Sequence, residues 1–508
     1  MKYLLGIDVG TSGTKTVLFS FEGVSVASAT YEYPLSQPQN GRAEQNPLDW
    51  WNATVSGIRD VLARAGASGG EVTGIGLSGQ MHGLVMLGRD GEVLRPSIIW
   101  CDQRTGAECG ELTRLVGRER LIAITANPAM TGFTASKILW VKNHEPEVYE
   151  KCAHILLPKD YIRYKLTGEF ATEVSDASGM QLMDVPARKW SDELLKLLGI
   201  DKSLLAAMYE SVDLTGTVSA SAAAETGLKA GTAVAGGAGD NPAAAIGTGV
   251  VNEGSAFTTI GSSAVVYAVS NEPRIDKDGR VHTLCASVPG KWTVMSCTQG
   301  AGISLKWLRD NCCAPECDRA LTQNVDPYVI MDSLAAEVPI GAGRLIFLPY
   351  LMGERSPHPD ADCRGVFFGL SASHTRAHLI RAVLEGVAFS QRECVDVFRE
   401  MGVPVDDMTV CGGGGRSPLW RQMLSDLYMC PVKTLAADEG GALGAAILAG
   451  VCTGVYSNLT EACDVVVKKK SPIMPDSTAN RQYSPYFELY KKLYRDLFED
   501  YKTLSTIN

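Results

Sequence analysis

Residues 4–15 read Leu4-Leu5-Gly6-Ile7-Asp8-Val9-Gly10-Thr11-Ser12-Gly13-Thr14-Lys15, and this stretch indicates the fold class more strongly than any other. An apolar run ends at a carboxylate and passes into a turn of Gly, Ser and Thr. The pattern predicts a buried strand and then a turn whose backbone N–H groups can hold a phosphate. It lacks the G-x-x-x-x-G-K-[ST] spacing of a Walker site. A tight hairpin that needs glycine only for its positive φ explains this turn, taken alone, equally well.

A second carboxylate, Asp240, lies in a similar setting far along the chain. It follows Val234-Ala235-Gly236-Gly237-Ala238-Gly239 and precedes Asn241-Pro242. A carboxylate beside a glycine-rich loop can bind Mg²⁺ or accept a proton from an attacking hydroxyl. A lone Asp is more often a helix cap, and Asn241 could itself cap a helix that begins at Pro242. Both interpretations can hold, because a helix start also favours a phosphoryl group. The two carboxylates suggest a nucleotide on one side of a cleft and an acceptor on the other.

At 508 residues, the chain exceeds what one hydrophobic core usually serves, so we expect two domains. A composition of 45% hydrophobic and 20% charged residues is typical of a soluble globular protein. The net charge of −10 argues against nucleic acid or an anionic membrane as the main partner. No apolar run approaches the ~20 residues of a membrane span, and Asp8 follows the N-terminus too soon for a signal peptide. We therefore expect a cytoplasmic protein.

The chain has 14 Cys, which we expect to be reduced thiols in a cytoplasm. Cys312, Cys313 and Cys317 form the one cluster in the sequence. The cluster lacks a fourth ligand at metal spacing, so packed or exposed thiols explain it better than zinc does. Its role stays open.

Strands and helices alternate along the first third of the chain, as in an α/β protein. The expected strands are Tyr3–Ile7, Thr16–Phe19, Val24–Tyr31 and Val72–Leu77, and a helix is expected to begin at Pro47. A second half begins near residue 250, because Ala256–Tyr267 repeats the strand, small-residue turn and strand of Ile7–Leu18. In the tail, we expect a loop over Asp476–Ser484 and an amphipathic helix over Pro485–Tyr501.

Gly412, Gly413, Gly414 and Gly415 are consecutive glycines between an expected strand, Met408–Cys411, and a helix that begins at Pro418. Each glycine costs backbone entropy on folding, and no ordinary turn needs this many. Close approach of a flat group, such as adenine with its ribose, explains them better than a plain flexible turn.

Two short polar segments have the character of a sugar site. Gln80, Met81 and His82 follow the strand that ends at Leu77, and they offer a donor, an acceptor and an apolar wall, which suits a polyol. Trp100 and Asp102 add an aromatic face and a carboxylate, which are common sugar contacts. A single histidine is usually a packed side chain, so His82 alone indicates little.

Eight segments, in this order along the chain, resemble the FGGY family of carbohydrate kinases in the actin-like ATPase superfamily. They are Gly6–Ser12, Ser78–Gly83, Gly132–Val141, Leu157–Tyr161, Gly236–Asn241, Leu348–Pro357, Gly365–Leu370 and Gly412–Ser417. They extend over nearly the whole chain, and the match is specific. The resemblance implies an α/β fold with two actin-like ATPase (ribonuclease H-like) domains around a central cleft.

The resemblance further implies a kinase that uses ATP and Mg²⁺ to phosphorylate D-xylulose at its terminal hydroxyl. The Ser78–Gly83 stretch carries the expectation about the sugar. We assign residues 1–245 to the sugar side, residues 246–480 to the nucleotide side, and residues 481–508 to a C-terminal helix. The expected partner is a small-molecule sugar, without nucleic acid or membrane. A homodimer is open, since the sequence does not fix the oligomeric state.

By position in the family's motifs, Asp240 would be the catalytic base and Asp8 would lie near the phosphates, with both as ligands of Mg²⁺. The expected sugar contacts are Gln80, Met81, His82, Trp100, Asp102, Asp240 and Asn241. The expected nucleotide contacts are Thr11, Ser12, Lys15, Gly261, Ser262, Gly412, Gly413 and Gly414.

Three alternatives share some of these features. An ATPase of the actin or chaperone class, with a macromolecular client, would have the same phosphate turns but would leave the polar residues Gln80–His82 unexplained. A non-catalytic sugar sensor is disfavoured by the intact Asp8 and Asp240. A kinase for another ketose or polyol, such as ribulose, stays open, because one hydroxyl's configuration can depend on side-chain angles alone.

Overall fold

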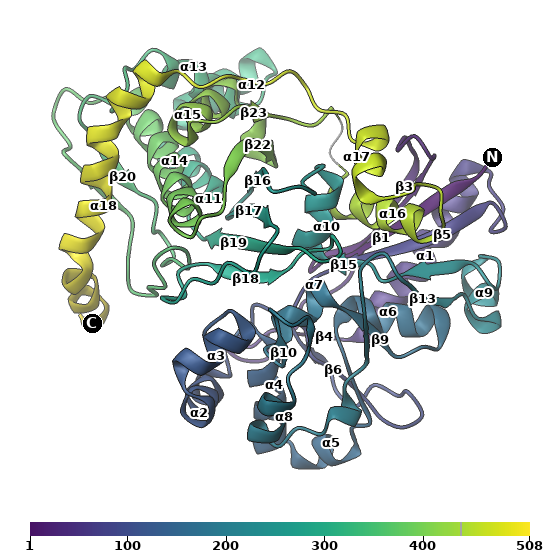
Figure 1. The fold of residues 1–508 in the computed structure, drawn as a ribbon. Coiled ribbons are helices and arrows are strands. Elements are labelled where there is room, and N and C mark those ends of the chain that lie inside the picture. Colours follow the sequence, from purple (N-terminus) through teal and green to yellow (C-terminus); the bar gives the residue numbers. More distant parts are fainter. Residues whose placement is uncertain (437–438, 508) are drawn as a thin grey trace. The chain divides into compact units, whose positions relative to one another are not determined.

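The computed structural model describes residues 1–436 and 439–507. Its contacts divide the chain into two compact units. The first contains residues 1–252, 269–293 and 439–468, and the second contains residues 253–268, 294–438 and 469–508. Each unit is built around a β-sheet with helices packed on it (Figure 1). The division into 1–245, 246–480 and 481–508 stays a prediction about function, whereas the contact-based units alternate along the chain.

The first unit contains a seven-stranded sheet with the order β13-β14-β5-β1-β2-β3, in which β15 also pairs with β5. Strand β1 (Tyr3–Val9) is antiparallel to β2 (Gly13–Phe19) and parallel to β5 (Val72–Gly79). Strands β3 (Ser25–Glu32), β13 (Leu214–Thr217), β14 (Ala233–Ala235) and β15 (Ala238–Gly239) complete it. The predicted strands are thus confirmed. Since β1, β5 and β15 run parallel, their carboxyl ends lie at one edge of the sheet.

Glycines let helix α16 (Gly440–Cys452) lie directly on this sheet. A Cβ atom added at Gly6 would stand 2.0 Å from the carbonyl oxygen of Ala442. A Cβ atom at Gly76 would stand 1.8 Å from the carbonyl oxygen of Ala445. Helix α10 (Asp240–Gly247) packs on α16 equally closely, since a Cβ atom at Gly444 would stand 1.8 Å from the carbonyl oxygen of Ala243. These glycines have a packing role rather than a turn role.

Helix α1 (Pro47–Ala65) covers strands β2 and β3, and it begins where Pro47 predicted it. Its N-cap is Asn46, and Gly66 ends it at a φ of 60°. The remaining helices of this unit are α2 (Gly106–Val116), α3 (Arg118–Thr125), α4 (Thr134–His144), α5 (Pro146–Lys151), α6 (Pro158–Thr167), α7 (Val174–Ala177), α8 (Asp192–Leu198), α9 (Ala220–Thr226) and α17 (Leu459–Val466). Short strands β4 (Glu44–Gln45), β6 (Val85–Leu87), β7 (Ser97–Ile98), β8 (His154–Leu156), β9 (Ala171–Glu173), β10 (Met183–Asp184), β11 (Lys189–Trp190), β12 (Ala207–Tyr209) and β18 (His282–Cys285) lie among them.

The sheet of the second unit repeats the strand arrangement of the first. Its strands follow the order β19-β17-β16-β22-β23. Strand β16 (Gly254–Ile260) is antiparallel to β17 (Ala264–Ser270) and parallel to β22 (Val405–Cys411), as β1 is to β2 and β5. The predicted internal repeat is therefore confirmed. The other elements are β19 (Trp292–Thr298), β20 (Ile346–Leu348), β21 (Val366–Phe368), β23 (Val432–Lys433), α11 (Gly302–Cys312), α12 (Ala314–Gln323), α13 (Pro327–Ala336), α14 (Arg376–Glu400), α15 (Pro418–Tyr428) and α18 (Ser477–Thr506).

The tail differs from the sequence prediction. Helix α18 begins at Ser477, so the loop expected over Asp476–Ser484 is wrong. Asp476 caps the helix by accepting a hydrogen bond from the Thr478 amide at 2.7 Å. Pro485 is tolerated inside the helix because the first turns are anchored: the Tyr483 hydroxyl, which is buried, accepts a hydrogen bond from Arg381 at 2.8 Å. Tertiary packing overrides the helix-breaking tendency of proline here. Over residues 1–436 and 439–507, no helix has the length and apolarity that a membrane crossing requires.

Candidate active site

Asp8 lies at the carboxyl edge of the first sheet. Its neighbours in register are Ser78 on β5 and Lys15 on β2, and the Ser78 hydroxyl donates to Asp8 Oδ1 at 2.8 Å. The first turn of α16 also approaches it, since a Cβ atom at Gly441 would stand 3.0 Å from Asp8 Oδ2. Burial raises the pKa of Asp8, while the Ser78 hydrogen bond and the Lys15 charge lower it. Asp8 is therefore a half-buried carboxylate near the N-terminus of α16. It lies at the carboxyl edge of the sheet, where ligands bind in open α/β folds.

Asp240 lies at the same edge, directly after β15. It is the first residue of α10, and Gly239 is the N-cap, so the expectation that Asn241 caps this helix is wrong. Asn241 instead donates its backbone N–H and its Nδ2 to Asp240 Oδ1, at 2.7 and 2.9 Å. Among the described residues, Asp240 Oδ2 accepts no hydrogen bond, and the side chain keeps partial exposure. This oxygen is therefore available to an incoming group.

The two carboxylates influence each other. Burial and, secondly, the negative charge of Asp8 raise the pKa of Asp240, the Asn241 hydrogen bonds lower it, and the net result is a rise from 3.8 to about 7. A carboxylate with a pKa near the working pH is suited to general base catalysis. Perturbed acids of this kind cluster at functional sites.

Lys15 and the turn that precedes it are held by partners that the sequence did not indicate. Lys15 Nζ forms an ion pair with Glu439 Oε2 at 2.6 Å, just before α16. The Gly10–Gly13 turn is closed by a 3.0 Å hydrogen bond from the Gly10 amide to the Gly13 carbonyl. Ser12 is exposed and Thr11 is half-buried. The turn follows the strand that carries Asp8 and keeps the Ser12 side chain exposed, and its contact with a phosphate stays a prediction.

Gln80 and Trp100 both contact Thr11. The buried Gln80 side chain donates to Gln45 Oε1 at 2.8 Å, and it faces the Thr11 hydroxyl at 3.4 Å. Trp100 Nε1 donates to Thr11 Oγ1 at 2.9 Å, and the Trp100 side chain is 38% exposed. Gln80 therefore stabilises the turn through these contacts, whereas the Trp100 ring is partly accessible to solvent.

Met81 lies beside the segment that carries Asp240, and His82 directly follows Met81 in the chain. A Cβ atom at Gly239 would stand 2.7 Å from Met81 Cγ, so Met81 packs on the residue before Asp240. His82 adopts a φ of 68°, and its carbonyl oxygen accepts hydrogen bonds from Lys137 Nζ at 2.8 Å and Thr134 Oγ1 at 3.1 Å. Lys137 is buried, which lowers its pKa to about 7. The sequence placed Lys137 in a family segment without indicating this contact.

Asp102 is the expected sugar contact that the structure places differently. Its side chain is 0% exposed, and its carboxylate accepts hydrogen bonds from the Ala43 amide at 2.6 Å and from Arg104 Nη2 at 2.7 Å. Arg104 in turn contacts Glu44 at 2.8 Å and stacks with its Cζ 4.8 Å from the centre of the Trp140 ring. In this conformation the Asp102 carboxylate is bonded within the protein and holds Arg104, so its role as a sugar contact stays a prediction.

In the second unit, the Gly261–Ser262 turn is tied to the start of α11. The Gly302 amide donates to the Gly261 carbonyl at 2.8 Å, and the Ile303 amide donates to the Ser262 carbonyl at 3.0 Å. Gly261 and Ser262 are both exposed. An exposed turn beside a helix N-terminus suits a phosphate.

The glycines after β22 differ in the structural constraint that requires a residue without a side chain. Gly412 has a φ of 78°, and a Cβ atom there would stand 2.8 Å from the Ile260 carbonyl oxygen. A Cβ atom at Gly414 would stand 2.5 Å from Ile260 Cγ2. Gly413 has no atom within 4 Å of such a Cβ and is exposed. Packing within the protein explains Gly412 and Gly414, so only Gly413 retains the open space that a flat ligand would use.

The donor set for a metal ion is small in the part of the chain that the structure describes. In the described part of the chain, no three His, Cys, Asp or Glu side chains are grouped to hold a metal ion. This finding includes the Cys312, Cys313 and Cys317 thiols, of which Cys313 is buried. The carboxylates of Asp8 and Asp240 are hard oxygen donors of the kind that Mg²⁺ takes, because this ion usually keeps several waters and shares substrate phosphates with one or two carboxylates.

The sequence matches the N-terminal domain of the FGGY family of carbohydrate kinases at residues 3–247 and the C-terminal domain at residues 256–453. It is 37% identical over 494 residues to the xylulose kinase of Bacillus subtilis (strain 168), covering 97% of each chain. It is 30% identical over 489 residues to the gluconokinase of the same organism, covering 96% of this chain and 94% of that one. The crystal structure of xylulose kinase from Rhodospirillum rubrum aligns with a TM-score of 0.91 and 32% identity over 99% of this chain and 100% of that chain. The predicted ribonuclease H-like, actin-like two-domain fold is confirmed.

Proposed function

Because the chain belongs to the FGGY family of carbohydrate kinases, we propose that it transfers the γ-phosphoryl group of ATP to the terminal hydroxyl of D-xylulose. The products are D-xylulose 5-phosphate and ADP. The observation that carries the chemistry is the position of Asp240 beside Asp8 at one sheet edge, with a pKa of about 7 and a free carboxylate oxygen.

Asp240 is the general base in this proposal. The proton of the sugar hydroxyl passes to Asp240 Oδ2, and the sugar oxygen forms a bond to the γ-phosphorus. The bond from that phosphorus to the bridging oxygen breaks, and ADP leaves. Asn241 keeps Oδ1 occupied, so that Oδ2 faces the substrate. General base catalysis of this kind contributes typically about 10²–10⁴-fold.

Asp8 and Asp240 are the residues that would hold Mg²⁺. When bound, this ion neutralises charge that develops on the phosphate oxygens. Thr11, Ser12 and Lys15 would contact the phosphates from the hairpin beside Asp8. In the second unit, Gly261 and Ser262 would contact phosphate. Of the expected adenosine contacts Gly412, Gly413 and Gly414, Gly413 would make the closest approach, because it has open space around it.

The sugar contacts are proposed with two changes from the sequence prediction. Met81, His82, Trp100 and Asn241 would contact the sugar together with Asp240. Gln80 and Asp102 would act indirectly, because both are buried and bonded within the protein. Gluconate is a second candidate acceptor, since a gluconokinase is among the relatives of this chain.

The proposal is tested by a coupled assay of ADP release with D-xylulose, D-ribulose, hexuloses, polyols and gluconate. We expect the highest kcat/KM for D-xylulose, and little ADP release without sugar. Asp240→Asn should lower kcat by about 10²–10⁴-fold while ATP binding is retained. A higher kcat/KM for gluconate than for D-xylulose would make gluconate the proposed substrate. A rate of ADP release that is the same with and without every sugar would overturn the assignment as a sugar kinase.

A further inference from the structure

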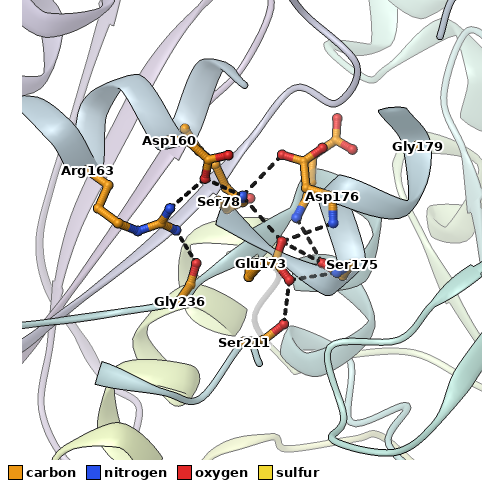
Figure 2. Close-up of polar contacts among 12 residues, drawn as sticks. Ser78, Asp160, Arg163, Glu173, Ser175, Asp176, Gly179, Ser211 and Gly236 are labelled. Atoms are coloured by element: carbon orange, nitrogen blue, oxygen red, sulfur yellow. Dashed lines mark hydrogen bonds and ion pairs between the residues drawn. The ribbon is translucent and has the colours of Figure 1, made fainter. Parts of the chain in front are cut away.

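A fully buried ionic cluster lies behind the segment that carries Asp240. Lys159 contacts Asp160, Glu173 and Asp176, with ion-pair distances of 2.9, 3.2 and 3.2 Å. Arg163 adds a 2.6 Å ion pair to Asp160. All these side chains are 0% exposed. Figure 2 shows Glu173 at the centre of the contacts and Arg163 at the side that reaches Gly236.

The cluster is electrically balanced if one of its three acids is protonated. Burial raises the pKa of Asp176, Lys159 lowers it, and the neighbouring Asp160 and Glu173 raise it, so that the pKa rises to about 8. At neutral pH, Asp176 is therefore mostly neutral, and two cations face two anions. Buried ion pairs of this kind rarely add net stability, because desolvating the charges offsets their attraction. A role in fixing geometry explains the cluster better than a role in stability.

Glu173 orders two serines. Its carboxylate accepts hydrogen bonds from Ser175 Oγ at 2.9 Å and from Ser211 Oγ at 2.8 Å (Figure 2). A hydroxyl has a single proton, so Ser175 can only accept in its other contact. That contact is the Gly239 amide, which donates to Ser175 Oγ at 3.3 Å. Glu173 thus fixes the orientation of the Ser175 hydroxyl. The oxygen of that hydroxyl then accepts the hydrogen bond from Gly239, the residue directly before Asp240.

The rest of the segment is held from the same side. Arg163 Nη2 donates to the Gly236 carbonyl, and the Gly237 amide donates to the Ser211 carbonyl at 3.0 Å. No larger residue fits at Gly237, because a Cβ atom there would stand 2.3 Å from the Leu77 carbonyl oxygen. The segment is therefore held between β5 and the cluster, and the Ala238 methyl group is the one side chain with which it can set its own position.

We propose that Glu173, Ser175 and Arg163 are positioning residues for Asp240, because they fix the Gly236–Gly239 segment from which the base projects. The inference rests on the proposed function of Asp240. Displacing a catalytic group by a fraction of an ångström to 1 Å can lower turnover by up to about 10²-fold. None of these residues touches substrate, so they act through the base alone.

Ser175→Ala is the test, and Ser178→Ala is its matched control. Both serines are fully buried, but Ser178 Oγ donates to the Ser175 carbonyl at 2.8 Å, accepts from the Cys285 amide at 3.2 Å, and has no hydrogen bond to residues 236–240. We expect Ser175→Ala to lower kcat about ten-fold or more with KM for ATP within about two-fold of wild type. Ser178→Ala should keep kcat within about two-fold while losing similar thermal stability.

A double-mutant cycle with Asp240→Asn separates the possible failures. If Ser175 acts through the base, adding Ser175→Ala to Asp240→Asn should lower kcat by less than about two-fold. An undiminished Ser175→Ala effect in that background, or equal kcat values for Ser175→Ala and wild type, would overturn the inference alone. Near wild-type turnover of Asp240→Asn would overturn the proposed function first, and this inference with it. Should Ser175→Ala fail to fold, Arg163→Lys, which keeps the charge but loses the Gly236 contact, should show the same loss of kcat and the same non-additivity.

Discussion

The pH dependence of turnover should report the ionisation of Asp240. A general base acts only when ionised, so activity is present above its pKa and is lost as the pH falls through it. With a pKa of about 7, half of the free enzyme is competent at pH 7. About one tenth of it is competent at pH 6, and about nine tenths at pH 8. An ordinary aspartate, with a pKa near 3.8, would give a flat profile over this range.

The perturbation that tests the cause of this pKa is Asp8→Asn. Removing the negative charge of Asp8 removes one contribution that raises the pKa of Asp240, so the acid limb should move to lower pH. The height of the profile is expected to fall as well, because Asp8 is also a proposed Mg²⁺ ligand. The position of the limb, rather than the height, is therefore the informative quantity.

The assay is ADP release measured from pH 5.5 to 8.5 with both substrates well below their KM values, so that the rate reports on the free enzyme. Asp192→Asn is a suitable control, since it neutralises a carboxylate that is 80% exposed. It should leave the limb in place. A flat wild-type profile, or an Asp8→Asn limb that stays fixed or moves to higher pH, would refute this explanation of the Asp240 pKa.

Three further outcomes follow from the glycines and from the buried cluster. Gly76→Ala should lower the free energy of unfolding in chemical denaturation by about 3 kcal/mol or more, because its Cβ would overlap the Ala445 carbonyl. The control Gly110→Ala, on the exposed face of α2, should raise the free energy of unfolding by about 1 kcal/mol. Asp176→Asn should gain stability relative to wild type as the pH rises from about 4 to 8. Folded Asp176 retains a proton that the unfolded chain has already released, so the stability of the wild type falls across this window. Equal pH slopes of stability for the two proteins would contradict the raised pKa. Gly413→Ala should leave the melting temperature unchanged but raise KM for ATP, and an unchanged KM would remove Gly413 from the nucleotide site.

The sequence was informative where the signal is local. The apolar runs before Asp8 and Asp240, and their glycine-rich surroundings, predicted strands that end at the carboxylates. The repeat of the strand, turn and strand at Ala256–Tyr267 predicted the antiparallel pair β16 and β17, which the structure confirms. Each of these inferences needs only neighbours along the chain.

Residues that act over long sequence distances were missed. Gly441 and Glu439 meet Asp8 and Lys15 only because α16 packs on the first sheet, and no pattern near residue 440 indicates this beyond a pair of glycines. Asp102 was expected to contact the sugar because a carboxylate next to an aromatic residue, Trp100, is a common sugar contact. Its burial against Arg104 is a tertiary fact that periodicity cannot supply. Glu173 carried no motif signal at all, although it orders the segment before Asp240.

A crystal structure with D-xylulose and a non-hydrolysable ATP analogue would test the role of Asp240 most directly. The distance to measure joins Asp240 Oδ2 to the oxygen of the terminal sugar hydroxyl. We expect about 2.6–3.2 Å, the range over which a base can accept a proton from a bound hydroxyl. A carboxylate that points away from this oxygen, with no bridging water between them, would contradict the proposed mechanism.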